Sequence, residues 1–149
     1  MELTGKIGSL LGNKGGQIWS LGPTASVYDA IALMAEKKVG ALPILDGEAL
    51  VGIVSERDYA RKVILKGRSS LDTPVTEIMS SPVVTVTPAH TVEQCMRIVT
   101  ERRIRHLPVV ENGRIVGMVS IGDLVKWTIT AQQETISHLE AFIGGTPQF

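Results

Sequence analysis

Two serine–aspartate pairs carry the most readable chemistry in the chain. Ser55 with Asp58, and Ser120 with Asp123, each follow an apolar run with the same three-residue spacing. If the run is a strand that leads into a helix, the serine caps the helix and the aspartate at N3 accepts a hydrogen bond from the N–H of the serine. The same carboxylate, beside free N–H groups, could instead hold ribose hydroxyls while the helix end receives phosphate. Both interpretations stay open on the motif alone.

The residue that precedes each aspartate differs between the two turns. Arg57 stands in the first turn, where its guanidinium and the backbone donors are expected to share a phosphate, and Gly122 stands in the second. An ion pair of Arg57 with Glu56 or Glu48 is the alternative. The candidate phosphate ligands near the second turn are Arg105 and His106.

The sequence contains no motif for catalysis. HExxH, GxSxG and the Walker loop are absent. The three histidines, His90, His106 and His138, lie far apart in the sequence, and none has a cysteine or carboxylate at ligand spacing. We therefore predict no enzymatic activity, no catalytic cofactor and no metal site.

The two turns belong to a longer internal duplication. Residues 23–58 align with residues 88–123 without a gap, and Pro43/Pro108 and Gly52/Gly117 are among the identical pairs. A duplication of this length indicates two copies of one supersecondary unit that pack together.

The order of the segments resembles the cystathionine β-synthase (CBS) domain. "VGALPILD" and "IRHLPVVE" are followed by "LVGIVSERD" and "IVGMVSIGD", and two such domains in tandem resemble a Bateman module. The resemblance extends over residues 5–130. It implies an α/β fold of two β-α-β-β-α repeats packed as a pseudo-symmetric pair. It also implies that adenosine-containing ligands, such as AMP, ADP, ATP, NAD(H) or S-adenosylmethionine, bind in clefts between the two repeats.

The resemblance also implies which residues bind the ligand. Residues before each Leu-Pro step contact the base in the family, and the aspartate holds the ribose. The expected nucleotide-binding residues of the first repeat are Val39, Gly40, Ala41, Leu42, Pro43, Ser55, Glu56, Arg57 and Asp58. Those of the second repeat are Ile104, Arg105, His106, Leu107, Pro108, Ser120, Ile121 and Asp123. Arg57 favours phosphate-bearing ligands over S-adenosylmethionine.

Composition limits the partners and the compartment. Fifteen basic and fifteen acidic residues cancel, which argues against binding to nucleic acid or to an anionic membrane. No apolar run approaches the ~20 residues that a membrane span requires, and the N-terminus does not resemble a signal peptide. The single Cys95 lies on an apolar helical spacing and is expected to be buried. One cysteine allows no disulfide within the chain, which fits a reducing cytoplasm.

The first part of each repeat is expected to contain a short helix, a strand and a longer helix. Leu3, Ile7, Leu10 and Leu11 predict a helix over residues 3–12 that Gly12 and Gly15-Gly16 end, and residues 74–79 are its counterpart. Residues 17–21 and 83–87 are predicted as the first strands. Ser26 and Thr91 are predicted to cap amphipathic helices of about three turns.

The second part of each repeat is expected to be a hairpin followed by a helix. Pro43 and Pro108 mark a strand beginning or edge, and Gly47 and Asn112-Gly113 mark the turns. The last helices are predicted from Glu56 to about Lys66 and from Ile121 to Gly144-Gly145.

These predictions divide the chain into four parts. Residues 1–66 are the first repeat with its lead-in helix, 67–73 the linker, 74–130 the second repeat and 131–149 a helical extension with a tail. The excess apolar residues of the extension predict a homodimer. The predicted function is a ligand-sensing regulatory module that binds an adenine nucleotide and modulates a partner protein. The alternatives are a structural dimerisation module without ligand and a nucleotide-acting enzyme.

Overall fold

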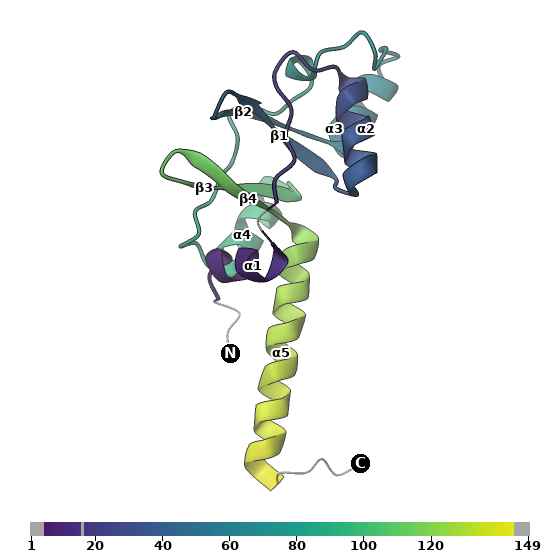
Figure 1. The fold of residues 1–149 in the computed structure, drawn as a ribbon. Coiled ribbons are helices and arrows are strands. Elements are labelled where there is room, and N and C mark those ends of the chain that lie inside the picture. The colour runs from purple at the N-terminus through teal and green to yellow at the C-terminus, as the bar shows by residue number, and fades with distance from the viewer. Residues whose placement is uncertain (1–4, 16, 145–149) are drawn as a thin grey trace. The chain divides into compact units, whose positions relative to one another are not determined.

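The computed structural model describes residues 5–15 and 17–144, and these fall into two compact units (Figure 1). Each unit joins distant parts of the chain. Unit 2 contains residues 17–85 and 110–116, and unit 1 contains residues 5–15, 86–109 and 117–144. The order of elements along the described residues confirms the predicted α/β fold with two repeats.

Unit 2 is built from the first repeat. Its elements are α2 (Val27–Lys37), β1 (Ala41–Asp46), β2 (Ala49–Ser55), α3 (Glu56–Tyr59), the π-helix η1 (Ala60–Ile64) and the 3₁₀-helix η2 (Val75–Glu77). β1 and β2 form an antiparallel hairpin in which Leu42 lies opposite Val54. Gly47, with φ of 64°, makes the predicted turn. α2 and α3 lie beside this hairpin (Figure 1).

The core of unit 2 is aliphatic. Val27, Ala30 and Met34 recur at helical spacing on α2 and are at most 2% exposed. They pack in one cluster with the buried residues of the other elements, Leu42, Ile44, Val54, Val63, Val75 and Ile78. Burial of a side chain of this size contributes about 1.5–3 kcal/mol, so this cluster fixes the hairpin against the helices.

Unit 1 is built mainly from the second repeat. Its helices are α1 (Ile7–Lys14), α4 (Val92–Arg102) and α5 (Ile121–Gly144). β3 (His106–Glu111) and β4 (Arg114–Ser120) form the second hairpin, whose residues are divided between the units. Asn112 and Gly113 both have positive φ, at 53° and 79°, as the predicted tight turn requires. Thr91 and Gln94 form the capping box of α4.

Each lead-in segment packs against the other repeat and not against the one that directly follows it in the sequence. Residues 5–15 pack against the second repeat, and residues 73–80 pack against the first. In unit 1 the N–H of Ile7 donates to His90 O at 2.9 Å, and that of Val92 donates to Gly5 O at 2.7 Å. In unit 2 the N–H of Val75 donates to Ala25 O at 2.9 Å, and that of Val27 donates to Thr73 O at 2.8 Å. The lead-in segments are therefore exchanged between the repeats. The division of the chain into repeats at the predicted boundaries stays a prediction.

A glycine in each hairpin makes room for the exchanged segment. A Cβ on Gly52 would lie 2.2 Å from Met79 Sδ, and a Cβ on Gly117 would lie 2.7 Å from Leu11 Cδ2. Both separations are shorter than any real Cβ contact. The identity of the two glycines in the duplication therefore follows from the close approach of a side chain to each strand.

Two predicted helices differ from the structure. The helix predicted over residues 3–12 begins at Ile7 and passes through Gly12, because Gly15, with φ of 96°, is the residue that ends it. Leu3 and Gly16 lie outside the described residues. The helix predicted from Glu56 to Lys66 changes from α to π at Ala60, a change that the sequence does not signal.

The predicted first strands, residues 17–21 and 83–87, are reduced to one parallel bridge each. Leu21 pairs with Ile44, and Val86 pairs with Val109. In both places the neighbouring residue of the partner strand is a proline, Pro43 or Pro108, which accepts a hydrogen bond but has no N–H to continue the ladder.

Candidate functional site

The two serine–aspartate turns form the predicted capping boxes. The N–H of Ser55 donates to Asp58 Oδ2 at 2.9 Å, and the N–H of Asp58 donates to Ser55 Oγ at 3.2 Å. In the second repeat the corresponding distances between Ser120 and Asp123 are 2.8 and 3.1 Å. The capping interpretation is therefore confirmed. The ribose interpretation concerns the same carboxylates and stays a prediction.

In each repeat the structure brings together the two stretches that were predicted to bind the ligand. The N–H of Glu56 donates to Gly40 O at 3.0 Å, and the N–H of Ile121 donates to Arg105 O at 2.9 Å. These two bonds join equivalent positions of the duplication. The start of one strand therefore lies directly against the helix N-terminus that follows its hairpin partner.

The predicted site residues differ in what they can offer a ligand. Leu42 and Leu107 are fully buried, and their side chains belong to the core. The remaining buried positions are Ala41, Pro43 and Pro108. Partly exposed or exposed positions are Val39, Gly40, Ser55, Glu56, Arg57, Asp58, Ile104, Arg105, His106, Ser120, Ile121 and Asp123. A ligand can therefore reach the helix N-termini, whereas the side chains of the Leu-Pro steps are buried beneath the surface of the site.

Each aspartate of the turns also holds a lysine ammonium. Lys62 Nζ lies 3.1 Å from Asp58 Oδ1 and donates to Ile78 O at 2.9 Å. Lys14 Nζ lies 2.6 Å from Asp123 Oδ2 and donates to Met118 O at 2.7 Å.

The sequence prediction missed both lysines. Lys62 follows Asp58 by four residues, a spacing that signals a helical ion pair. Lys14 is 109 residues from Asp123, and no local pattern connects them.

The electrostatics of the second turn follow from this pair. Burial raises the pKa of Asp123, but the hydrogen bonds from Lys14 and from Ser120 lower it by more, so the pKa lies below its ordinary value. Burial lowers the pKa of His106, Lys14 lowers it further, Asp123 raises it, and Arg105 lowers it, with a net decrease. At neutral pH the turn therefore carries an ionised Asp123 beside a neutral His106.

The single cysteine takes no part in this chemistry. Cys95 is fully buried in unit 1, and burial raises the pKa of its thiol to about 11. The predicted burial is confirmed, and the thiol is protonated at neutral pH.

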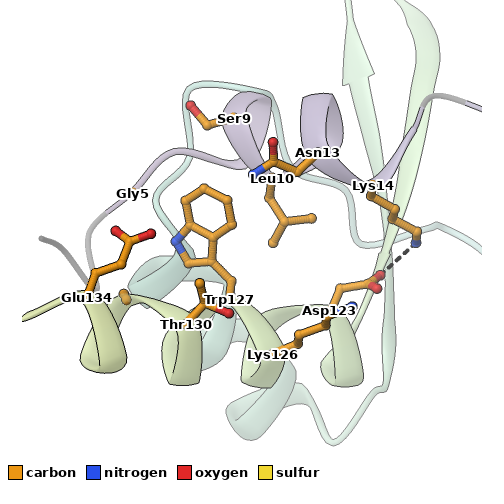
Figure 2. Close-up of a pocket in the computed structure, with 11 residues that line it drawn as sticks. Gly5, Ser9, Leu10, Asn13, Lys14, Asp123, Lys126, Trp127, Thr130 and Glu134 are labelled. Atoms are coloured by element: carbon orange, nitrogen blue, oxygen red, sulfur yellow. Dashed lines mark hydrogen bonds and ion pairs between the residues drawn. The ribbon is translucent and has the colours of Figure 1, made fainter. Parts of the chain in front are cut away.

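A pocket of about 590 Å³ lies beside the second turn, between α1 and α5 (Figure 2). Its volume is within the range of small-molecule sites, about 300–1,000 Å³. The polar and aromatic lining residues are Ser9, Asn13, Lys14, Asp123, Lys126, Trp127, Thr130 and Glu134. Of the residues predicted to bind nucleotide, Asp123 alone is among those that line this pocket.

The arrangement of the described residues also bears on metal binding and on membrane spanning. Within residues 5–15 and 17–144, no group of three or more His, Cys, Asp or Glu side chains is arranged to hold a metal ion. In the same part of the chain, no helix has the length and apolar character needed to cross a membrane.

The two repeats match a known family in sequence as well as in arrangement. Residues 17–65 and 75–129 each match the CBS domain. The chain belongs to the CBS domain family. CBS domains in general are regulatory rather than catalytic modules and bind adenosine-containing ligands.

Individual CBS proteins are similar over most of this chain. The mitochondrial CBS domain-containing protein CBSX3 of Arabidopsis thaliana is 43% identical over 125 residues, which are 80% of this chain and 61% of the plant protein. The chain thus spans less than two thirds of that relative. YhcV of Bacillus subtilis is 33% identical over 72% of this chain and 76% of its own length. Since CBSX3 is described as mitochondrial, the cytoplasmic location stays a prediction.

A solved structure supports the same assignment. A protein with CBS domains from Burkholderia ambifaria has a TM-score of 0.82 and 48% sequence identity, and the match covers 85% of this chain and 96% of that one.

Proposed function

We propose that this CBS protein is a ligand-sensing module that binds an adenine nucleotide, AMP, ADP, ATP or NAD(H), at its strand-to-helix turns. Binding shifts the population of its conformations toward the one that makes more contacts with the ligand. The shift changes how the module contacts a regulated protein.

One observation carries the proposal. The same combination of carboxylate, helix N-terminus and adjoining strand occurs at equivalent positions in both repeats, closed by Glu56 N–H to Gly40 O and by Ile121 N–H to Arg105 O. A helix N-terminus attracts phosphate, and a carboxylate beside it can accept from both ribose hydroxyls. The family in general binds adenosine-containing ligands, all of which carry the ribose hydroxyls.

A thermal-shift panel of AMP, ADP, ATP, NAD, NADH and S-adenosylmethionine tests the proposal directly. A ligand present at 100 times its dissociation constant stabilises the folded state by about 2.7 kcal/mol. We expect at least one phosphate-bearing member to raise the melting temperature and S-adenosylmethionine to have less effect. No shift with any member would favour the structural dimerisation module. Turnover of ATP or NAD, followed by chromatography, would favour the enzyme.

Substitution of the aspartates separates ligand binding from helix capping. Asp58→Asn and Asp123→Asn should each weaken nucleotide binding at their own turn, because charge-assisted hydrogen bonds contribute about 1.5–3 kcal/mol. Asp29→Asn is the matched control, since Asp29 closes the same kind of capping box with Ser26 at the start of α2. Titration calorimetry should detect a loss of affinity for the first two variants only. If all three variants bound the nucleotide with equal affinity and only their stability fell, helix capping would be the whole role of Asp58 and Asp123.

We propose further that two copies of the chain associate through α5. Residues 132–139 of this helix are all exposed. Ile129, Ile136 and Ile143 recur every seven residues and are 54%, 49% and 79% exposed. Val125 and Leu139 fall on the second apolar position of the same heptad. Gln132 is the polar residue at that second position. β-Branched residues at the first position with Leu139 at the second favour a two-stranded coiled coil, which supports a homodimer.

Measurement of mass in solution at micromolar concentration tests this association. The native chain should give twice its 16.0 kDa mass. Ile136→Glu should give a monomer, because a charge would be buried in the seam. Ser137→Glu adds the same charge one residue away, off the apolar positions, and should remain a dimer. A native chain of single mass would contradict the proposal.

A further inference from the structure

Lys14 links the exchanged helix α1 to the carboxylate of the second turn. Its ammonium lies 2.6 Å from Asp123 Oδ2 and donates to Met118 O at 2.7 Å (Figure 2). The side chain of Asp123 is 24% exposed and that of Lys14 is 39% exposed. The ammonium is therefore held at the N-terminal turn of α5 by two hydrogen bonds and still faces solvent.

Its bonds to Asp123 and Met118 distinguish Lys14 among the cations near the second turn. The position that Arg57 occupies in the first repeat is Gly122 here. The pKa of His106 is lowered by burial and by Lys14, so its imidazole is neutral at neutral pH. Arg105 is exposed, and its backbone oxygen bonds to the helix N-terminus. Lys126 lines the same pocket, but Lys14 is the lysine whose ammonium is bonded to Asp123 and to Met118 O, so a phosphate that reaches this turn meets an ammonium already held there.

We infer that Lys14 sets the preference of the second turn for phosphorylated over unphosphorylated adenosine ligands. In the absence of ligand its ammonium neutralises Asp123. When ribose hydroxyls donate to Asp123, the ammonium leaves the carboxylate and binds the phosphate. Adenosine supplies the hydroxyls but no anion, so its binding leaves the ammonium without a charged partner. This inference rests on the proposed nucleotide binding and names the residue that reads the phosphate.

The pocket between α1 and α5 gives the ammonium room to move. Lys14 and Asp123 both line this cavity of about 590 Å³, and Lys14 reaches Asp123 from the last residue of α1 (Figure 2). A lysine has a flexible four-carbon stem and a compact charge, so it can exchange one anion for another without movement of the helix.

Calorimetric titration with AMP and with adenosine tests the inference. The titrations use the full chain with Asp58→Asn, which weakens the first turn. Lys14→Met places at this position the residue that the other lead-in segment has at the same offset, Met79. We expect the ratio of AMP to adenosine affinity to fall about 10-fold to 100-fold, the equivalent of one charge-assisted hydrogen bond. Lys14→Arg should keep most of the ratio, and raised salt should lower it in the unsubstituted chain.

Lys6→Met is the matched control, because Lys6 belongs to the same lead-in segment and does not line the pocket. It should leave the ratio unchanged. Carboxyl NMR of the ligand-free protein adds an independent readout: the pKa of Asp123 should rise in Lys14→Met and stay unchanged in Lys6→Met. A raised pKa with an unchanged AMP-to-adenosine ratio would overturn the inference and leave Lys14 a structural ion pair. If no variant and no native chain bound either ligand, the proposed function itself would fall with it.

Discussion

The two repeats neutralise equivalent aspartates with lysines from different parts of the chain. In the first repeat Asp58 is paired with Lys62, four residues on. In the second repeat Asp123 is paired with Lys14 of the exchanged helix α1. The position equivalent to Lys62 is Trp127, which lines the pocket beside α1.

The lead-in segments also differ at the position of the lysine. Lys14 in one corresponds at the constant offset to Met79 in the other, and Met79 packs against Gly52 of the first hairpin. At these two pairs of equivalent positions a lysine and an apolar residue are therefore interchanged: Lys14 corresponds to Met79, and Lys62 corresponds to Trp127. A helix N-terminus already stabilises a carboxylate. The lysine is needed because an unpaired charge in a partly buried turn is costly. A duplicated site can therefore keep its carboxylate neutralised while the lysine that neutralises it comes from a different part of the chain.

The largest effects are expected in the cores, where the two repeats should respond alike. Leu42→Ala and Leu107→Ala remove equivalent side chains that are both fully buried. Each should lower the free energy of unfolding by about 2–5 kcal/mol, because both leave a cavity that the hairpin cannot close. Urea denaturation measures the loss. A loss below 1 kcal/mol at either position would show that the repeat concerned tolerates the cavity by repacking.

Substitution of the hairpin glycines should destabilise the two repeats to different extents. Gly52→Ala meets the sulfur of Met79 and also its Cγ at 2.8 Å and Cβ at 3.1 Å, whereas Gly117→Ala meets mainly the terminal carbons of Leu11. Overpacking of this kind costs about 1–3 kcal/mol. Because atoms close to the backbone move less than side-chain ends, Gly52→Ala should be the more destabilising. Denaturation of both variants in parallel decides the order, and the reverse order would contradict the argument.

Arg57 should make the two turns differ in ligand binding. Because Gly122 is its counterpart, Arg57→Ala should lower the preference for AMP over adenosine at the first turn by about tenfold, or ~1.4 kcal/mol. The second turn should be unaffected. Calorimetry in the Asp123→Asn background isolates the first turn. Equal losses of AMP and adenosine affinity would mean that Arg57 does not read phosphate.

The capping serines should show the smallest effect and the closest agreement. Ser55→Ala and Ser120→Ala each remove the acceptor of an aspartate N–H, at 3.2 and 3.1 Å. The loss of such a cap costs about 0.5–2 kcal/mol. Thermal denaturation of the two variants should give similar decreases. A much larger decrease at Ser120 would mean that the Lys14–Asp123 pair depends on the cap.

Local sequence patterns predicted most of the secondary structure. Ser26 and Thr91 cap helices where expected, and both hairpins turn at the predicted glycines, because these signals act within a few residues. The first strands were predicted too long, since apolar β-branched runs do not reveal that Pro43 and Pro108 end the ladder on the partner strand.

Part of the candidate site could likewise be predicted from the sequence, and part could not. The capping boxes were predicted from the Ser-x-x-Asp spacing, and the resemblance to the CBS domain implied that the Leu-Pro stretches and the helix N-termini share a site. Lys14 does not, because its partner is 109 residues away and the lead-in segments are exchanged. A duplication in sequence predicts equivalent units but not which copy of a segment packs against which.

The exchange of lead-in segments also has a consequence for synthesis on the ribosome. Helix α1 is translated before the residues of unit 1 against which Ile7 and Leu10 are buried. At typical elongation rates of about 5–20 residues per second, α1 waits about 5–20 s before residue 123 is added. Residues 17–85 need not wait so long, because they supply most of unit 2 themselves. Residues 17–85 should therefore fold while α1 remains undocked. Until the residues that bury it are translated, the apolar face of α1 is exposed and can bind a ribosome-associated chaperone.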